Sequence, residues 1–315
     1  MKVSKFLPQE QSNLFAFHDL IKNFFKLYYK NKLPNKILLN GLNGIGKSTF
    51  AYHLINFIFS KDEDYKYDEK NFQIDIKNKS YNLIKNNSHP NLYVVKANEN
   101  KNFIEISQIR EMIDFTNKSS FNSKERIILI DNVEMLNPNA LNALLKNLEE
   151  PNENIYFILV YDSSKKIKNT LKSRCNKYNL NLTRKQNFEI ANKIINNNFD
   201  TLINKSLISH YDSPGDIINF ITFVKSTQID AINITLNDFL IKIINEKYYK
   251  NNYFIKNNIY KFIELFFLNE VKYDKYNNKI DKFYHFFIKK INNLKNFNLD
   301  EEVFFIEFKD KLLNE

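Results

Sequence analysis

The stretch Gly41-Leu42-Asn43-Gly44-Ile45-Gly46-Lys47-Ser48 decides the fold of this chain. Its spacing, G-x-x-x-x-G-K-S, is that of a phosphate-binding loop (P-loop), whose glycines let successive backbone N–H groups point at an anion. Three of the four glycines in 315 residues lie within it. We expect Lys47 to reach the β- and γ-phosphates of ATP or ADP, and Ser48 to coordinate Mg²⁺. The expected nucleotide ligands are Gly41, Gly44, Gly46, Lys47, Ser48 and Thr49.

The sequences on either side of the loop support this interpretation over a chance glycine-rich turn. The apolar run Lys36–Asn40 precedes the loop and predicts a buried strand. After the loop, apolar residues recur at helical spacing from Phe50 to Ile58. The order strand, loop, helix places the phosphate at a helix N-terminus.

Strand-like and helix-like segments alternate up to about residue 183, which predicts an α/β fold with a mainly parallel sheet and helices on both faces. The expected strands are 37–40, 92–95, 127–130, 155–160 and 178–182. We interpret the polar residues 60–88 as a surface insertion with some helix near 81–85.

The strand signal ends near residue 184, and we expect a small helical lid over 184–226 and an all-helical collar over 227–315. Helices are predicted at 185–197, 199–210 and 214–226, the last starting at Pro214. Apolar stripes in the collar predict core or subunit-interface faces: Leu236, Phe239, Leu240, Ile243 and Ile244, then Ile259, Phe262, Ile263 and Phe266, then Phe283, Phe286 and Phe287.

Composition excludes several classes of protein. The one cysteine, Cys175, rules out a disulfide framework or a multi-cysteine zinc site within the chain. No apolar signal segment opens the sequence, and the longest apolar run, 155–161, is too short to cross a bilayer. We therefore predict a cytoplasmic protein with no membrane contact. The net charge of +10 fits either nucleic-acid binding or lysine drift in an AT-rich genome.

A second part of the nucleotide site is predicted where the strand Arg126–Ile130 ends in Asp131. A carboxylate at that position lies beside a P-loop and can hold the Mg²⁺ shell; the alternative is a strand-end Asp that caps a turn. Asn132 follows where hydrolytic motors have Glu, and an amide cannot accept a proton from water. Glu134, two residues on, is expected to point elsewhere.

Two further motifs carry the identity of the chain. Asn137-Pro138-Asn139-Ala140-Leu141-Asn142-Ala143-Leu144-Leu145-Lys146-Asn147-Leu148-Glu149-Glu150-Pro151 predicts a helix, with acids at a C-terminus where the helix dipole disfavours them. Ser173-Arg174-Cys175 follows, in a chain with only four arginines. The rigid guanidinium of Arg174 suits a phosphate or a carboxylate; the alternative is a structural salt bridge.

Together with His89-Pro90-Asn91 and Ile106-Ser107-Gln108-Ile109-Arg110, these motifs resemble the bacterial sliding-clamp loaders of the AAA+ class, and among them the delta-prime subunits of DNA polymerase III. The resemblance spans about 34–226 in motifs. It implies an AAA+ module, a lid and a collar, with Arg174 as an arginine finger acting in trans. It implies gamma/tau and delta subunits, the sliding clamp and primed DNA as partners.

The chain departs from the family at several positions, which affects the predicted activity. Relatives with zinc hold it in the segment matching 60–88, where this chain has no cysteine, so no zinc is expected. Tyr161 and Asp162 occupy the sensor 1 position, and Gly215 stands at the sensor 2 arginine. We therefore expect weak nucleotide binding and little hydrolysis by this chain. The alternatives are a gamma/tau-type ATPase and an unrelated P-loop kinase or ATPase.

Overall fold

Five parallel strands form the centre of the N-terminal part of the chain in the computed structural model, which describes residues 6–97, 103–118, 125–149, 154–273, 278–297 and 300–313. The strand order is β2-β3-β4-β1-β5. The strands are β1 (Lys36–Gly41), β2 (Leu92–Val95), β3 (Arg126–Ile130), β4 (Ile155–Asp162) and β5 (Asn176–Asn179). β1 is an internal strand, which pairs with β4 through Leu38↔Leu159 and with β5 through Leu38↔Lys177. The predicted α/β fold with a parallel sheet is confirmed.

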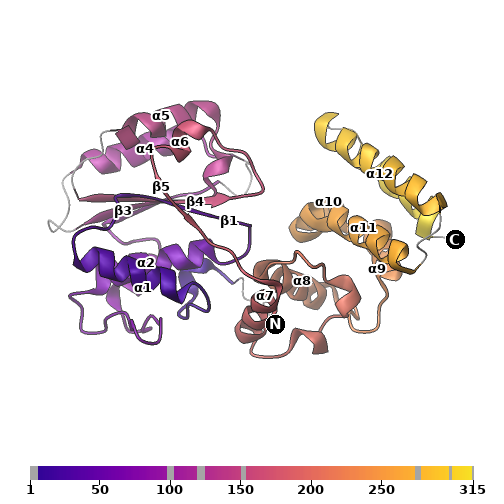
Figure 1. Cartoon of the computed structure of the whole chain (residues 1–315), viewed down its shortest axis with the longest axis horizontal. Coiled ribbons are helices and arrows are strands. Elements are labelled where there is room, and N and C mark those ends of the chain that lie inside the picture. The colour runs from indigo at the N-terminus through magenta and orange to yellow at the C-terminus, as the bar shows by residue number, and fades with distance from the viewer. Residues whose placement is uncertain are drawn as a thin grey trace. The chain divides into compact units, whose positions relative to one another are not determined.

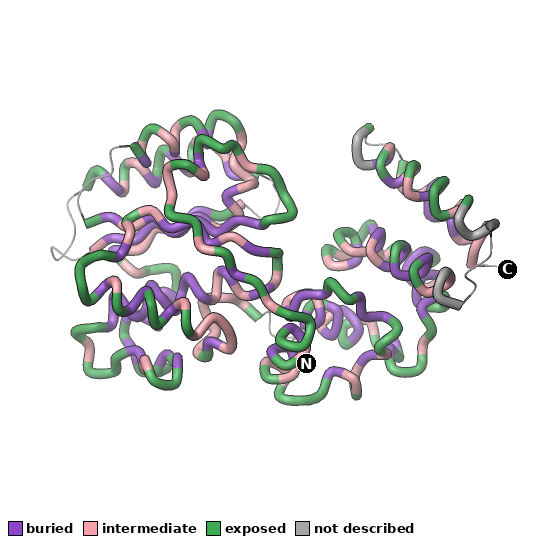
Figure 2. The backbone as a smooth tube through the Cα atoms, viewed as in Figure 1, coloured by how far each residue is buried: buried purple, intermediate pink, exposed green. Residues whose placement is uncertain are grey.

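Helices cover both faces of this sheet (Figure 1). One face packs against α1 (His18–Tyr29), α2 (Lys47–Ser60) and α3 (Lys79–Lys85), and the other against α4 (Ile106–Asn117), α5 (Pro138–Glu149) and α6 (Asn169–Lys172). Each face of the sheet has its own hydrophobic core, and successive residues of a strand point into opposite cores. Ile37 and Leu39 belong to the first core and Leu38 to the second. The tube in Figure 2 is accordingly buried along the central strands.

Residues 60–88 are more than the surface insertion that the sequence predicted. The expected helix is present as α3, but Tyr67, Phe72 and Ile74 are buried and belong to the same core as α1 and α2. The aromatic rings explain this difference. Polar residues separate them in the sequence, so no apolar run indicated that the segment buries several large side chains.

The chain folds into two compact units. The α/β unit contains residues 2–190 and also 213–215, and the helical unit contains 191–212 and 216–315. The 3₁₀ turns are η1 (Pro8–Glu10), η2 (Val133–Met135), η3 (Phe199–Thr201) and η4 (Lys205–Leu207). The remaining helices are α7 (Arg184–Ile195), α8 (Pro214–Thr227), α9 (Leu236–Asn245), α10 (Tyr248–Asn251), α11 (Tyr253–Tyr273), α12 (Asn278–Phe297) and α13 (Glu301–Phe308), followed by the π-type turn η5 (Lys309–Leu313). The separation of lid from collar near residue 226 stays a prediction.

The helix expected over 199–210 is wrong, because only the two turns η3 and η4 form there. Asn198 and Asn204 cap these turns with their side chains, accepting from Asp200 N and Ser206 N. An Asn side chain that bonds the backbone two residues on competes with helix continuation. β5 also begins two residues earlier than expected, although Leu180 N still donates to Asn40 O at 2.7 Å.

Aromatic rings make the core of the helical unit. Phe220 of α8 lies 5.4 Å from both Phe239 of α9 and Phe262 of α11, measured between ring centroids. The stripes predicted on α9 and α11 are buried, whereas on α12 Phe287 is buried and Phe286 is 39% exposed. The rings of α8 therefore share one core with helices beyond residue 226.

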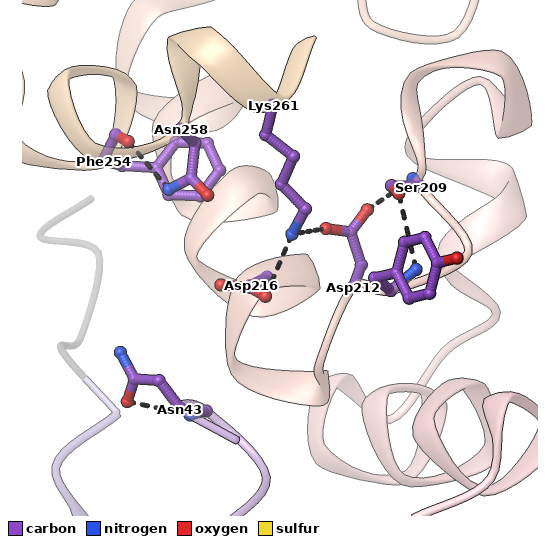
Figure 3. A network of polar contacts seen from close by, with 9 residues as sticks. Asn43, Ser209, Asp212, Asp216, Phe254, Asn258 and Lys261 are labelled. Atoms are coloured by element: carbon purple, nitrogen blue, oxygen red, sulfur yellow. Dashed lines mark hydrogen bonds and ion pairs between the residues drawn. The ribbon is translucent and has the colours of Figure 1, made fainter. Parts of the chain in front are cut away.

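An ion network ties the connection before α8, α8 itself and α11 together within this unit (Figure 3). Lys261 of α11 forms ion pairs with Asp212 and, at 3.3 Å, with Asp216. Asp212 in turn accepts a hydrogen bond from Ser209 N at 2.5 Å. Burial opposes the charge on Lys261, but the two carboxylates raise its pKa. Removing one partner would leave a poorly solvated charge, so the network fixes how these helices meet.

His53 predicts the pH dependence of stability in the α/β unit. Its side chain is fully buried on α2, with Nδ1 3.0 Å from the Tyr67 hydroxyl, and burial lowers the pKa of His53 to about 3. In the unfolded chain the pKa is about 6.5. A folded pKa below the unfolded value stabilises the fold above pH 6.5, and that stability is lost as the pH falls from 6.5 toward 3.

We therefore expect the free energy of unfolding to fall by about 2 kcal/mol between pH 7 and pH 5 through His53. His53→Gln should remove that part of the pH dependence in urea unfolding measured at the two pH values. His210→Gln, at an exposed position, is the matched control. An unchanged pH dependence in His53→Gln would contradict the assignment.

Candidate functional site

The P-loop forms because a buried strand ends where the backbone must enter two left-handed turns. β1 runs through Ile37, Leu38 and Leu39, which are all fully buried, and ends at Gly41. Gly44 and Gly46 then adopt φ values of 76° and 94°, which glycine takes without steric cost. Gly46 is the residue before α2, so the loop leads directly into a helix N-terminus as predicted.

The fourth glycine of the chain also belongs to this loop. Gly215, in the first turn of α8, donates its backbone N–H to Gly44 O at 2.9 Å. A Cβ at Gly215 would lie 2.9 Å from Gly44 Cα, and one at Gly44 would lie 2.1 Å from the Ser213 Oγ. A Cβ at Gly41 would lie 2.3 Å from the backbone oxygen of Leu180. The backbones of Gly41 and Leu180, and those of Gly44 and Gly215, therefore approach each other too closely for a Cβ to fit at these glycines.

Lys47 is buried in the loop, with 4% of its surface exposed. Its Nζ donates to Gly41 O at 2.8 Å and to Leu42 O at 2.5 Å. Burial lowers the pKa of Lys47, and the carboxylates of Asp162, Glu134 and Asp131 act in the opposite direction. Two loop carbonyls thus hold the Lys47 ammonium at the P-loop, within reach of a phosphate group bound there.

Ser48 and Asp131 come together, although they are 83 positions apart in the sequence. The Ser48 hydroxyl donates to Asp131 Oδ1 at 2.8 Å. Burial raises the pKa of Asp131, while the Ser48 hydrogen bond and Lys47 lower it. A hydroxyl beside a carboxylate at a P-loop is a donor set that suits Mg²⁺ with a nucleotide. Thr49 lies next to them, half-buried in the first turn of α2.

Glu134 belongs to this site, which corrects the expectation that it points elsewhere. Asn132 is left-handed, with φ 60°, and this turn leads into η2. Glu134 Oε2 then accepts from the backbone N–H of Asp162 at 3.1 Å, and burial raises the pKa of Glu134. The sequence signal for this turn is the asparagine at position 132, because asparagine tolerates the left-handed conformation that directs the chain back toward the site.

Arg174 lies apart from the P-loop contacts, in the connection from α6 to β5. Its Nε donates to Glu149 Oε1 at 3.1 Å, Nη2 donates to the same oxygen, and Nη1 donates to Thr170 O at 2.9 Å. The Arg174 side chain is 33% exposed and that of Glu149 is 54% exposed. The salt-bridge alternative thus describes a contact that does form, but the pair faces water.

Comparison with known proteins places the chain in a family. The sequence profile described as DNA polymerase III, delta subunit, matches residues 17–184, more than half of the chain. The chain belongs to this family. The resemblance drawn from the P-loop, the 137–151 segment and Ser173-Arg174-Cys175 is therefore confirmed.

Curated relatives carry names from the same assembly. The DNA polymerase III subunit delta' of Buchnera aphidicola subsp. Schizaphis graminum is 30% identical over 64% of this chain and 59% of its own length. The subunit gamma of the same organism is 34% identical over 45% of this chain and 41% of its own length. The chain thus spans less than two thirds of each relative.

A solved structure is also similar: a DNA polymerase III gamma subunit-related protein from Thermotoga maritima, with a TM-score of 0.49 and 15% identity. The match covers 90% of this chain and 96% of that one.

Membrane spans and metal-binding clusters are both absent from the part of the chain that the structure describes. Among the described residues, no helix is long and apolar enough to span a membrane. Within those same ranges, no three His, Cys, Asp or Glu side chains gather in a way that could hold a metal ion by themselves. Cys175 is a free thiol, and burial raises its pKa to about 11, so it is a poor nucleophile.

The glycine contacts lead to a prediction about stability. Gly41→Ala should lower the free energy of unfolding by about 1–3 kcal/mol, because the new Cβ would meet the Leu180 carbonyl. Asn40→Ala, which removes one exposed hydrogen bond to Asn179, is the control and should cost less. Urea unfolding of both variants measures the difference. Equal effects would show that the backbone contact at Leu180 relaxes freely.

Proposed function

We propose that the chain acts as a delta-prime-type subunit of a sliding-clamp loader. In this role it supplies Arg174 to the ATP site of a neighbouring subunit. It assembles with gamma/tau and delta subunits and helps to load the sliding clamp onto primed DNA. The family match and the curated delta' relatives support the proposal.

One observation carries the choice of a non-hydrolytic role. The position expected to hold a second phosphate-sensing arginine is Gly215, and its backbone packs against Gly44 with no space for a side chain. An arginine cannot occupy this position unless the start of α8 leaves the P-loop. Asn132 also replaces the acid that would take a proton from water. The chain's own site therefore lacks two groups that hydrolysis requires.

The P-loop residues still fit a nucleotide. Gly44, Gly46, Lys47 and Ser48 would hold its phosphates, and Ser48 with Asp131 would hold Mg²⁺. Bound Mg²⁺ would attract both the nucleotide phosphates on the loop and the Asp131 carboxylate at the end of β3. The carboxylates of Asp131, Glu134 and Asp162 surround Lys47 and weaken the positive field at the loop. Binding should consequently be weak.

A second candidate function is a gamma/tau-type ATPase, which the position of Glu134 favours. Burial raises the pKa of Glu134, and its carboxylate is held near Lys47 at the P-loop, where a general base would be needed. Glu134 is anchored by the Asp162 N–H, however, which restrains it from approaching an attacking water. The two candidates differ in one measurable quantity, the turnover of the isolated chain.

The isolated chain should bind ATP or ADP weakly and hydrolyse ATP well below about 1 per second. Lys47→Ala should abolish binding in a fluorescent-nucleotide titration, and Glu134→Gln should leave the background turnover unchanged. Turnover at 1 per second or faster that Glu134→Gln removes would establish the ATPase instead.

Arg174→Ala should lower the DNA- and clamp-stimulated ATPase rate of the reconstituted complex while assembly, checked by gel filtration, stays intact. Arginine fingers in GTPases contribute about 10³–10⁵ in rate. A ring with several ATP sites should lose less, since one site alone loses its finger. Arg174→Lys should also be impaired, because a point charge replaces a bidentate fork.

Arg184→Ala is the matched control, since this exposed guanidinium stacks on Phe188 within its own helix. It should retain the wild-type rate. Wild-type rates in Arg174→Ala would reduce Arg174 to a salt-bridge residue and overturn the proposed function.

A further inference from the structure

Glu149 stands where local chemistry disfavours it. It is the last residue of α5, close to the partial negative charge of the helix C-terminus. An acid at that position is unfavourable, because the carboxylate meets the negative end of the helix dipole. Its contact with Arg174, which lies 25 positions further along the chain, accounts for the placement.

The contact uses only part of the guanidinium. Arginine carries five N–H donors: one on Nε and two on each terminal nitrogen. Glu149 Oε1 accepts from Nε and Nη2, and Thr170 O accepts from Nη1. Three donors are thus engaged. Within the part of the chain that the structure describes, one donor on Nη1 and one on Nη2 remain for another acceptor.

The remaining pair has a definite chemistry. Two parallel N–H donors on the terminal nitrogens match two oxygens of a phosphoryl group, which is the bidentate arrangement that arginine prefers. Since Glu149 holds the Nε–Nη2 edge and Thr170 O holds Nη1, the guanidinium plane is restrained at all three nitrogens. The Arg174 side chain is therefore ordered before a phosphate binds, and less conformational entropy is lost on binding.

Energetics indicate that this contact orients the side chain rather than stabilising the fold. With 33% and 54% of the two side chains exposed, the pair faces water. Ion pairs that face water contribute little to the stability of a fold. Such a contact, made by a residue that its own helix disfavours, does little for folding but can select one rotamer of Arg174.

We propose that Glu149 is a positioning residue for Arg174: it holds the Nε side of the guanidinium and presents the two terminal N–H groups to the γ-phosphate on a neighbouring subunit. This inference rests on the proposed function. It adds a residue of this chain that acts on the neighbour's reaction without touching the nucleotide.

The test uses the reconstituted clamp loader with Glu149→Ala, Glu149→Gln and Glu189→Ala in this chain. Glu189 is the matched control, because it forms an i,i+4 ion pair with Lys185 and is likewise 54% exposed. We expect Glu149→Ala to lower kcat of the stimulated ATPase to a value between wild type and Arg174→Ala. KM for ATP should be unchanged, since the neighbour's P-loop is intact. Glu149→Gln should be intermediate, because an amide oxygen still accepts hydrogen bonds, and Glu189→Ala should match wild type.

A double-mutant cycle separates positioning from a structural effect. If Glu149 acts only through Arg174, Glu149→Ala should have no further effect in the Arg174→Ala background. An additive loss in the double variant would overturn the inference, and so would a wild-type or increased kcat in Glu149→Ala. Those results leave the proposed function standing if Arg174→Ala alone lowers the rate; a wild-type rate in Arg174→Ala defeats both.

Discussion

The close approach of backbone to backbone around the P-loop is the constraint on which the rest of the site depends. Gly41 lies against the Leu180 carbonyl, and Gly44 lies against Gly215. No side chain fits at these contacts. The loop therefore packs directly against the residue after β5 and against the first turn of α8, within one unit. Three of the four glycines of the chain make these contacts, and the fourth, Gly46, supplies the left-handed turn before α2. The same contact that shapes the phosphate loop removes the space for a sensing arginine.

In the proposed function, the nucleotide-binding residues and the catalytic arginine lie at different places in one chain. Lys47, Ser48 and Asp131 retain the geometry of a nucleotide site. The group best suited to stabilise a developing phosphate charge is Arg174, which makes its contacts with Glu149 and Thr170 on another edge of the α/β unit. We propose that such a subunit influences hydrolysis through a neighbour, and that its own nucleotide would order the loop.

Sequence reasoning predicted the elements whose signals are local. The strand–loop–helix order and the proximity of Asp131 to Ser48 followed from motif spacing, because parallel strands end at one edge of the sheet. Glu134 and the Gly215 contact were missed, since each depends on a turn of the backbone through space. The two turns at 199–207 replaced a predicted helix because asparagine caps compete with apolar periodicity. The core aromatic residues of 60–88 were hidden among charges.

The central claim is that this chain donates a catalytic group and does not itself turn over ATP. It is tested most directly in a clamp loader reconstituted with this chain intact and with the P-loop lysine of every other ATPase subunit replaced by alanine. The account predicts that DNA- and clamp-stimulated hydrolysis falls to background. Stimulated hydrolysis that persists in this complex, and that Lys47→Ala then abolishes, would contradict it.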